Sequence, residues 1–314
     1  MSTATRLGAY GASLVVVFGA AYAAGDAVVP ERTVQRWTQA AQGHGGSPST
    51  GTAAVPASAT GVTSAQGGYL LTPVSVPTTV GDAGRLSFRI LDARGVAVTD
   101  FATSHEKQLH LIVVRTDGTR FRHVHPVLAA DGTWSLPWEW AAAGSYRVYA
   151  DFVPAADAGG EALTLTRTVE VAGPLRPVAA AASDTASVGG FSVRVTGDLV
   201  AGSSSRLTFS VTRDGEPVTS LQPYLGAFGH LVALREGDLA FLHVHPEGAG
   251  PADGGRAGPM VEFAAEAPTP GRYLLYLDFQ VDGTVHSAPF VVDARPAPSA
   301  PTATGNHAGD GHGH

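Results

Sequence analysis

Two segments of this 314-residue chain repeat one another at a distance of 120 residues. The first, HLIVVRTDGTRFRHVHP, begins at His110, and the second, HLVALREGDLAFLHVHP, begins at His230. In each, a histidine opens an apolar run, a turn dipeptide follows, and a second run ends in His-Val-His-Pro. Two apolar runs joined by Asp-Gly or Gly-Asp are typical of a β-hairpin. The repeat therefore predicts two copies of a β-rich domain, each containing such a hairpin.

The position of the turn determines which residues of the hairpin face each other. With the Asp-Gly dipeptide at 117 as a two-residue loop, His110 lies opposite His125, and Ile112 lies opposite His123. Side chains alternate between the two faces of a strand, so the three histidines share one face, with the opposed pair about 5 Å apart at Cβ. Imidazoles at this spacing can converge on one metal ion.

The second copy repeats the same register. With Gly-Asp at 237 as the loop, His230 lies opposite His245, and Val232 lies opposite His243. We therefore expect a second histidine cluster and about one metal ion per domain. The competing interpretation is a packing or hydrogen-bonding motif that duplication copied together with the fold.

Further candidate ligands accompany the histidines. A late strand carries Asp151 in the first domain and Asp278 in the second, each inside a Tyr-x-Asp-Phe frame. Each aspartate is interpreted as a fourth ligand, as an outer acceptor that holds a histidine N–H, or as a structural residue that caps a turn. His105 is an additional candidate ligand in the first domain, where the second domain has Leu225 at the same place.

The composition excludes several kinds of function. The chain has no cysteine, which rules out disulfides, thiolate metal sites and a cysteine nucleophile. With only two methionines, a thioether-rich Cu(I) site is excluded, so a transition metal would use imidazole and oxygen ligands, which favours Cu(II), Zn(II) or Ni(II). The net charge of −7 and the absence of a basic cluster give no support to a nucleic-acid partner.

The chain is expected to divide into six parts. Residues 7–24 are uncharged and apolar, so residues 1–25 are interpreted as a signal-anchor that crosses the membrane or as a cleaved signal peptide. Both alternatives place the domains outside the cytoplasm, either held at the cell membrane by a single span or secreted. The remaining parts are a flexible tether (26–66), a first sandwich (67–173), a linker (174–188), a second sandwich (189–295) and a disordered tail with histidines (296–314).

The fold is predicted to be all-β. Strand-like runs are expected at 85–91, 108–116, 120–125, 145–153 and 163–171, and again at 191–196, 206–213, 271–281 and 284–292. Glycine and proline together make up about a fifth of the chain, which suits short strands and many turns. We therefore expect two tandem antiparallel β-sandwiches, immunoglobulin-like or cupredoxin-like, after the N-terminal membrane helix.

At these motifs the chain resembles a group of actinobacterial membrane-anchored or secreted proteins that are described as secreted or heavy-metal-binding. The resemblance covers residues 67–292 and the N-terminal anchor, and it rests on HEK-x-x-HLIVVR and HVHP in the first domain and LGA-x-GHLVALR and LHVHP in the second. More loosely, the expected sandwich is similar to CopC-like and YtkA-like copper-associated domains. CopC-type sites use the mature N-terminal amine as a ligand, and that feature does not carry over to this chain.

The expected function is that of a non-enzymatic, extracytoplasmic protein that binds a divalent transition metal, with Cu(II) favoured over Zn(II). It would sequester or buffer the metal or hand it to a membrane transporter. One alternative is a cupin-like metalloenzyme, because a glycine six residues before His243-x-His245 matches the start of the cupin signature, although the expected glutamate is absent. The other is a metal-free adhesion or scaffold module on the cell surface.

Overall fold

A computed structural model describes residues 60–298, apart from 158, 159, 161, 180, 243, 249 and 252–254. By its contacts the chain divides into a unit of residues 1–55 and a unit of residues 56–314, and the description below concerns the second. The expected membrane segment (1–25), most of the tether and most of the tail lie outside the described residues. Within the described ranges, no helix is both long enough and apolar enough to cross a bilayer.

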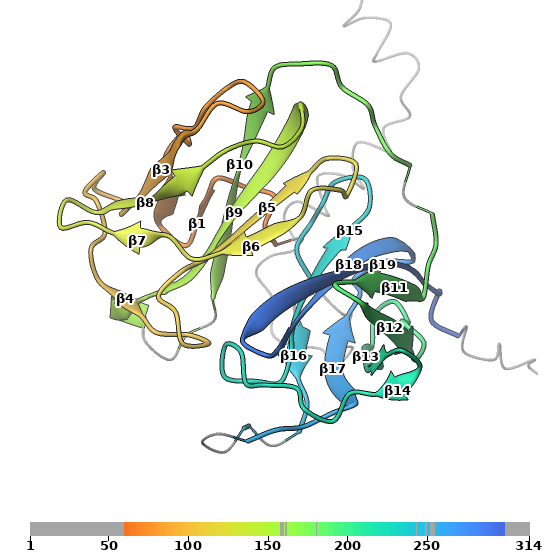
Figure 1. The fold of residues 1–314 in the computed structure, drawn as a ribbon. Coiled ribbons are helices and arrows are strands. Elements are labelled where there is room, and N and C mark those ends of the chain that lie inside the picture. The colour runs from red at the N-terminus through yellow and green to blue at the C-terminus, as the bar shows by residue number, and fades with distance from the viewer. Residues whose placement is uncertain are drawn as a thin grey trace, which may run out of the picture. The chain divides into compact units, whose positions relative to one another are not determined.

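The first domain is a sandwich of two antiparallel sheets (Figure 1). One sheet has the strand order β1-β2-β3-β8-β7, and the other has the order β10-β9-β5-β6, with β4 also paired to β9. The first sheet consists of β1 (Ala65–Gln66), β2 (Tyr69–Leu71), β3 (Gly84–Leu91), β8 (Thr133–Trp138) and β7 (Val127–Leu128). The second consists of β10 (Leu163–Val171), β9 (Gly144–Pro154), β5 (His110–Arg115), β6 (Arg122–Val124) and β4 (Phe101–Ala102), and a 3-10 turn, Ala155–Asp157, follows β9.

The second domain repeats this plan with one change. Its larger sheet has the order β11-β12-β13-β17-β16, with β14 also paired to β13, and its smaller sheet has the order β15-β18-β19. The larger sheet consists of β11 (Thr185–Val188), β12 (Phe191–Thr196), β13 (Ser204–Arg213), β17 (Met260–Glu266), β16 (Val244–Pro246) and β14 (Glu216–Pro217). The smaller one consists of β15 (His230–Arg235), β18 (Gly271–Val281) and β19 (Thr284–Ala294). The prediction of an all-β, immunoglobulin-like sandwich fold with an internal repeat is confirmed.

The predicted hairpin register holds in the first domain. In the pairing of β5 with β6, Leu111 faces Val124 and Ile112 faces His123. The turn itself differs from the expected two-residue loop, because Gly118 N donates to Arg115 O at 2.8 Å and Arg115 N donates to Thr119 O at 2.9 Å. Gly118, at φ 77°, holds a left-handed position that glycine adopts easily.

In the second domain the hairpin register holds only next to the turn. Leu234 and Phe241 face each other as predicted, and the amide of Leu242 donates to Ala233 O at 2.8 Å. The chain then leaves β15, and β16 pairs with β17 instead, where His245 faces Ala264. The predicted pairing of His230 with His245 is therefore wrong.

The two copies differ in residue type at the point where the hairpins diverge. In the first domain the exposed Arg122 extends over the ring of Trp138, with Cζ 3.7 Å from the ring centroid. The second domain has Leu242 at the same place, and this side chain is buried in the core of that domain, where Val244 also packs. Burial of Leu242 stabilises the course of the strand there, because an apolar side chain gains free energy when it leaves water.

Four strands bury side chains on both of their faces. On β5 and β9, Leu111 and Val148 point into the core of the first domain, whereas Ile112 and Tyr149 point to the opposite face. The outward-facing side chains join those of β15 and β18 in a third apolar cluster between the domains, which we call the interdomain core. Its buried members are Ile112, Val114, Tyr149, Val232, Leu234, Leu239, Leu274 and Tyr276.

Contacts across the interdomain core are reciprocal. Tyr149 of the first domain donates a hydrogen bond to Leu239 O at 2.7 Å, and the equivalent Tyr276 of the second donates to Gly118 O at 2.6 Å. Each tyrosine thus bonds to the hairpin turn of the other domain, and Phe121 stacks on Tyr276 with ring centroids 4.0 Å apart. The two halves meet as the subunits of an isologous dimer do, through the same surface on each side.

We expect Tyr276→Phe to lower the free energy of unfolding by about 1–2 kcal/mol, because the carbonyl of Gly118 would lose its partner inside a buried interface. Tyr149→Phe should cost a similar amount for the equivalent reason. Urea unfolding monitored by circular dichroism measures both. If the two variants unfold as the parent does, these hydroxyl groups do not support the interface.

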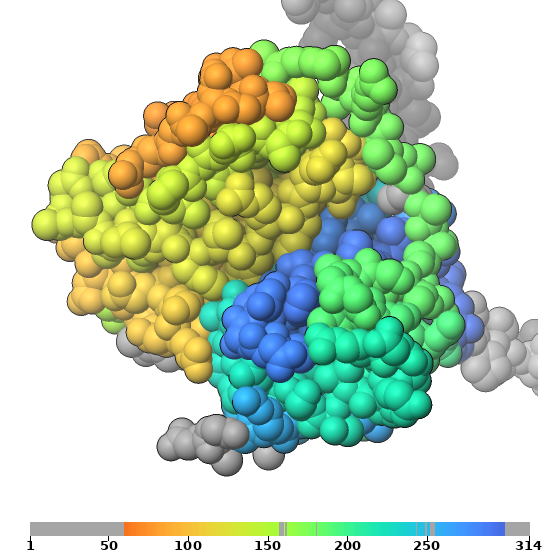
Figure 2. Space-filling view, in the orientation of Figure 1, coloured from red at the N-terminus to blue at the C-terminus, as the bar shows by residue number. Residues whose placement is uncertain are grey.

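The linker between the domains runs over the surface of the first domain (Figure 2). Leu175 and Val178 are 55% and 53% exposed, but the backbone beside them is held, because Val178 N donates to Asp117 Oδ2 at 2.9 Å. Arg115, which pairs with Asp117 at 2.7 Å, also donates to Arg176 O at 3.2 Å. The first hairpin turn therefore anchors the linker.

Candidate metal centre

Five imidazoles gather at the edge of the interdomain core. The ring centroid of His110, on β5, lies 5.3 Å from that of His123, 5.0 Å from that of His125 and 5.6 Å from that of His230. His123 lies 4.7 Å from His230, which comes from β15 of the second domain. His105 completes the group at 5.7 Å from His230. The sequence predicted one cluster in each domain, but the structure combines residues of both domains in one cluster.

The nitrogens of three histidines of the first domain meet at one point. His110 Nδ1 lies 3.0 Å from His123 Nε2 and 3.2 Å from His125 Nε2. The hairpin register produces this junction, since it brings His110 opposite His125 with His123 on the same face. The structure thus brings these three histidines of the first domain together.

Asp278 reaches this junction from the second domain. Its Oδ2 lies 2.7 Å from His123 Nδ1, and the side chains of both residues are only 1% exposed. The other carboxylate oxygen, Oδ1, accepts a hydrogen bond from Ser287. Asp278 therefore occupies the position of an outer acceptor that fixes the orientation and tautomer of His123.

The hydrogen-bond partners determine which nitrogens carry hydrogen. The carbonyl oxygen of Ser104 can only accept, so His110 Nε2, at 3.0 Å from it, is the donor. The carboxylate of Asp278 also only accepts, so His123 Nδ1 donates to it. If both imidazoles are neutral, His110 Nδ1 and His123 Nε2 are unprotonated, and their lone pairs face each other at 3.0 Å. The contact becomes favourable when a cation lies between the two nitrogens, either a metal ion or a second proton carried by His123 beside the Asp278 carboxylate.

Burial disfavours protonation of the imidazoles around His123. Burial, reinforced by the neighbouring His123, lowers the pKa of His110 to about 4 and that of His125 to about 3. Burial also holds the pKa of His230 well below its usual value. At neutral pH these three imidazoles are uncharged, which is the state in which imidazole coordinates a metal.

The lowered pKa values give the metal-free protein a pH-dependent stability. Between pH 6.5 and the folded pKa values, the unfolded chain binds more protons than the folded one, so stability falls as the pH drops through that interval. At pH 5 each of the two histidines should cost up to about 2 kcal/mol relative to pH 7.5. Urea unfolding of the chelator-treated chain at both pH values tests this, and His125→Gln should flatten the dependence. Equal stability at pH 7.5 and pH 5 would contradict it.

The spacing of the nitrogens suits coordination by imidazole. Ligands about 2.0–2.1 Å from a tetrahedral ion stand about 3.3 Å from each other, close to the 3.0 Å and 3.2 Å found here. Ligand atoms of His110, His123 and His230 all lie within 4.8 Å of one another. Moreover, His230 Nδ1 is buried and has no hydrogen-bond partner among the described residues. A buried nitrogen without a partner is costly unless something else binds it.

Of the remaining predicted ligands, the structure describes His245 and Asp151. His245 is exposed on β16, in the larger sheet of the second domain, and His243 lies outside the described residues. Asp151 faces His110 across the strand pair and accepts a hydrogen bond from Thr164 Oγ1 at 2.7 Å. His230, expected in a cluster of the second domain with His243 and His245, instead lies beside His110 and His123 of the first domain.

The cupin alternative requires a further histidine downstream of His243 and His245, and His286 is the candidate for it. This side chain packs among aromatic rings. Its ring centroid lies 4.8 Å from that of Phe191 and 5.4 Å from that of Phe279. It comes from β19, where it faces Phe279 across the strand pair.

The contributions of Ser104, Ser287 and the other domain were not predicted. One signal in the sequence does point to the interface. HLIVVR and HLVALR are continuous apolar runs, and such runs are typical of strands that are buried on both faces. All six residues of β5 are indeed buried, so the outer face of this strand has a packing partner.

A family profile matches both halves of the chain, at residues 64–173 and 186–296, and its description is "Domain of unknown function (DUF8832)". The chain belongs to this family. The two DUF8832 matches fall on the two sandwiches, and each includes one of the repeated histidine segments. A search of curated proteins finds no match to the sequence.

Several solved structures resemble the chain weakly. Domains 4–9 of the surface layer protein SbsC match with 12% identity and a TM-score of 0.22, over 73% of this chain and 31% of that one. The bacterial integrin-binding protein invasin matches with 16% identity and a TM-score of 0.22, over 74% and 40%. Yersinia pseudotuberculosis InvD matches with 13% identity and a TM-score of 0.22, over 70% and 56%. The chain thus spans about a third to a half of these structures, and similarity at this level supports no inference about function.

Proposed function

We propose that this protein binds one transition-metal ion, Cu(II) in preference to Zn(II), in the centre between its two domains. The ligands would be His110, His123 and His125 of the first domain and His230 of the second. The observation that carries the proposal is the junction of three ring nitrogens, at which His110 Nδ1 lies 3.0 Å from His123 Nε2 and 3.2 Å from His125 Nε2. A metal cation at this junction would accept the lone pairs of all three nitrogens.

The choice of metal rests on the donor set. The ligands are neutral imidazoles, and no cysteine is present in the chain to favour a softer ion. Among the common divalent ions, imidazole sites bind Cu(II) most tightly, and Zn(II) also accepts such ligands. Asp278 would keep His123 in the coordinating tautomer and raise its basicity through the bond to Nδ1.

The proposed biological role is to buffer the metal or hand it on outside the cytoplasm. Support for this location comes from the uncharged apolar stretch at residues 7–24, which fits either a membrane anchor or a secretion signal. A membrane transporter is the proposed recipient of the metal, since an anchored and tethered domain could reach it.

Metal content provides the test. The full chain, with the three tail histidines His307, His312 and His314 replaced by asparagine, is loaded with Cu(II) or Zn(II), freed of excess ion and analysed for metal. We expect about one ion per chain, held more tightly than about 1 μM. Two tightly held ions would favour one site per domain, and no retained ion would disprove the proposal.

A further inference from the structure

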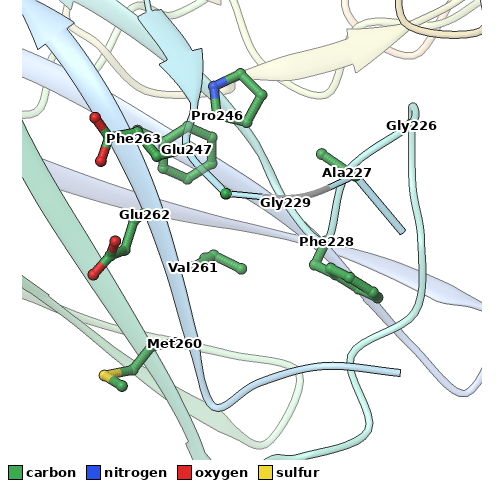
Figure 3. A pocket seen from close by; sticks show the side chains of 12 residues that line it. Gly226, Ala227, Phe228, Gly229, Pro246, Glu247, Met260, Val261, Glu262 and Phe263 are labelled. Carbon is green, nitrogen blue, oxygen red and sulfur yellow. The ribbon is translucent and has the colours of Figure 1, made fainter. Parts of the chain in front are cut away.

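The second domain has a cavity of about 440 Å³ (Figure 3). It is lined by the loop before β15 and by parts of β16 and β17, including Phe228, Met260 and Val261. A second and much smaller cavity, of about 20 Å³, adjoins it and is lined by His105 and His230. Both cavities share the lining residues Ala227, Gly229, Pro246 and Phe263.

The small cavity has the size of a passage for single ions. A space of about 10–15 Å³ holds one water molecule, so 20 Å³ admits one particle of that size. Its walls include two imidazoles, which can replace the water ligands of an incoming ion. The large cavity, in contrast, has room for a chelating group that carries or accepts the ion.

His105 stands at this passage in an unusual backbone conformation. It forms a two-residue turn with Glu106, closed by hydrogen bonds between Ser104 and Lys107 at 2.8 Å and 3.0 Å. The φ angles of His105 and Glu106 are 46° and 65°, in the left-handed region that asparagine and glycine adopt more easily. A turn of this kind favours Asn-Gly, so the presence of histidine is a local conflict of the sort found at functional sites.

The equivalent turn of the second domain lacks the imidazole. There Leu225 and Gly226 hold the two left-handed positions, with φ of 57° and 77°, and Tyr224 bonds to Ala227. Leu225 is 1% exposed, whereas His105 is exposed and lies 5.7 Å from His230 and 6.1 Å from His110 between ring centroids. The first domain therefore places a metal-binding group where the second places a packing residue.

We infer that the two adjoining cavities are the route by which metal ions reach and leave the centre, and that His105 is the transfer ligand on this route. The inference rests on the proposed metal site and adds to it a path and a residue for exchange. His105 binds the ion first on the way in and last on the way out. The partner that this route fits is a small metal chelator, or a chelating side chain of a protein, that enters the large cavity.

Rates of metal transfer test the route. The Cu(II)-loaded full chain is mixed with excess EDTA in a stopped-flow instrument, and the loss of the copper absorption band gives the transfer rate. His105→Asn should slow both release and loading at least tenfold, because asparagine fits the turn but does not replace imidazole. Glu106→Asn is the matched control, since it places asparagine at the other left-handed position of the same turn and keeps His105. Its transfer rates should stay within twofold of those of the parent.

A steric variant tests the cavities independently of His105. Ala227→Trp should also slow release at least tenfold, because Ala227 lines both cavities. Ala141→Trp, in a separate cavity of the first domain, should leave the rate unchanged. Parental rates in either His105→Asn or Ala227→Trp would overturn the route. A weaker affinity of His105→Asn with an unchanged loading rate would make His105 an ordinary ligand and would also overturn it. A parent chain that retains no copper would instead refute the metal site itself.

Discussion

His110→Gln should weaken Cu(II) binding at least 100-fold. His110 contacts both His123 and His125 through Nδ1, at 3.0 Å and 3.2 Å, so its loss removes one ligand and the group that aligns two others. Each tenfold loss of affinity corresponds to about 1.4 kcal/mol, and a 100-fold loss to about 2.8 kcal/mol. Competition titration against a chelator of known affinity measures the effect.

His245→Gln provides the control for this experiment. From the sequence, His245 is expected at the centre of a second cluster, as His125 is in the first, and its loss would then be among the most damaging. In the structure His245 is exposed on β16 and pairs with β17, so its replacement should leave the affinity within about twofold of that of the parent. A large loss in His245→Gln would mean that the centre is not the one described here.

Val232→Asp should separate the two domains and abolish tight metal binding with them. The side chain of Val232 is fully buried in the interdomain core and not in the core of its own domain. A carboxylate at this position costs about 3–5 kcal/mol if it stays buried without a partner, so the interface should open instead. His230 and Asp278 would then no longer face the histidines of the first domain.

Urea unfolding and copper titration together reveal the separation. The parent should unfold in one transition, and Val232→Asp should unfold in two, since each sandwich keeps its own core. Val127→Asp is the control, because Val127 is 73% exposed and its replacement should change neither stability nor affinity. A single transition at the parental midpoint, with copper still bound, would show that the interface is not needed for the site.

Local patterns in the sequence predicted the local structure, that is, the strands and the register of the first hairpin. The apolar runs beside the Asp-Gly segment determine how Ile112 faces His123, because a slip by one residue would turn the apolar side chains to the other face. The same reasoning failed after Leu242 in the second domain. There β16 pairs with β17, and alternation along a strand does not report which strand becomes its partner.

The contacts that complete the metal centre could not be predicted from the sequence, because they join residues that are far apart in the chain. His123 and Asp278 are 155 residues apart in the chain and meet only after both sandwiches have formed and docked. From the sequence, Asp278 was a candidate ligand or hydrogen-bond acceptor, but the histidine to which it would bond could not be predicted. In this structure the histidine belongs to the other domain.

The reciprocal packing of the two sandwiches has a consequence for how such a site can evolve. Two separate copies would meet only at sufficient concentration, and every substitution would appear on both sides of the twofold axis. A covalent linker replaces that bimolecular step with an effective local concentration in the millimolar range. It also frees each half to change alone, so one half can have His105 where the other keeps Leu225. Fusion thus allows an asymmetric site, with one side specialised for exchange, that a symmetric pair of identical chains could not contain.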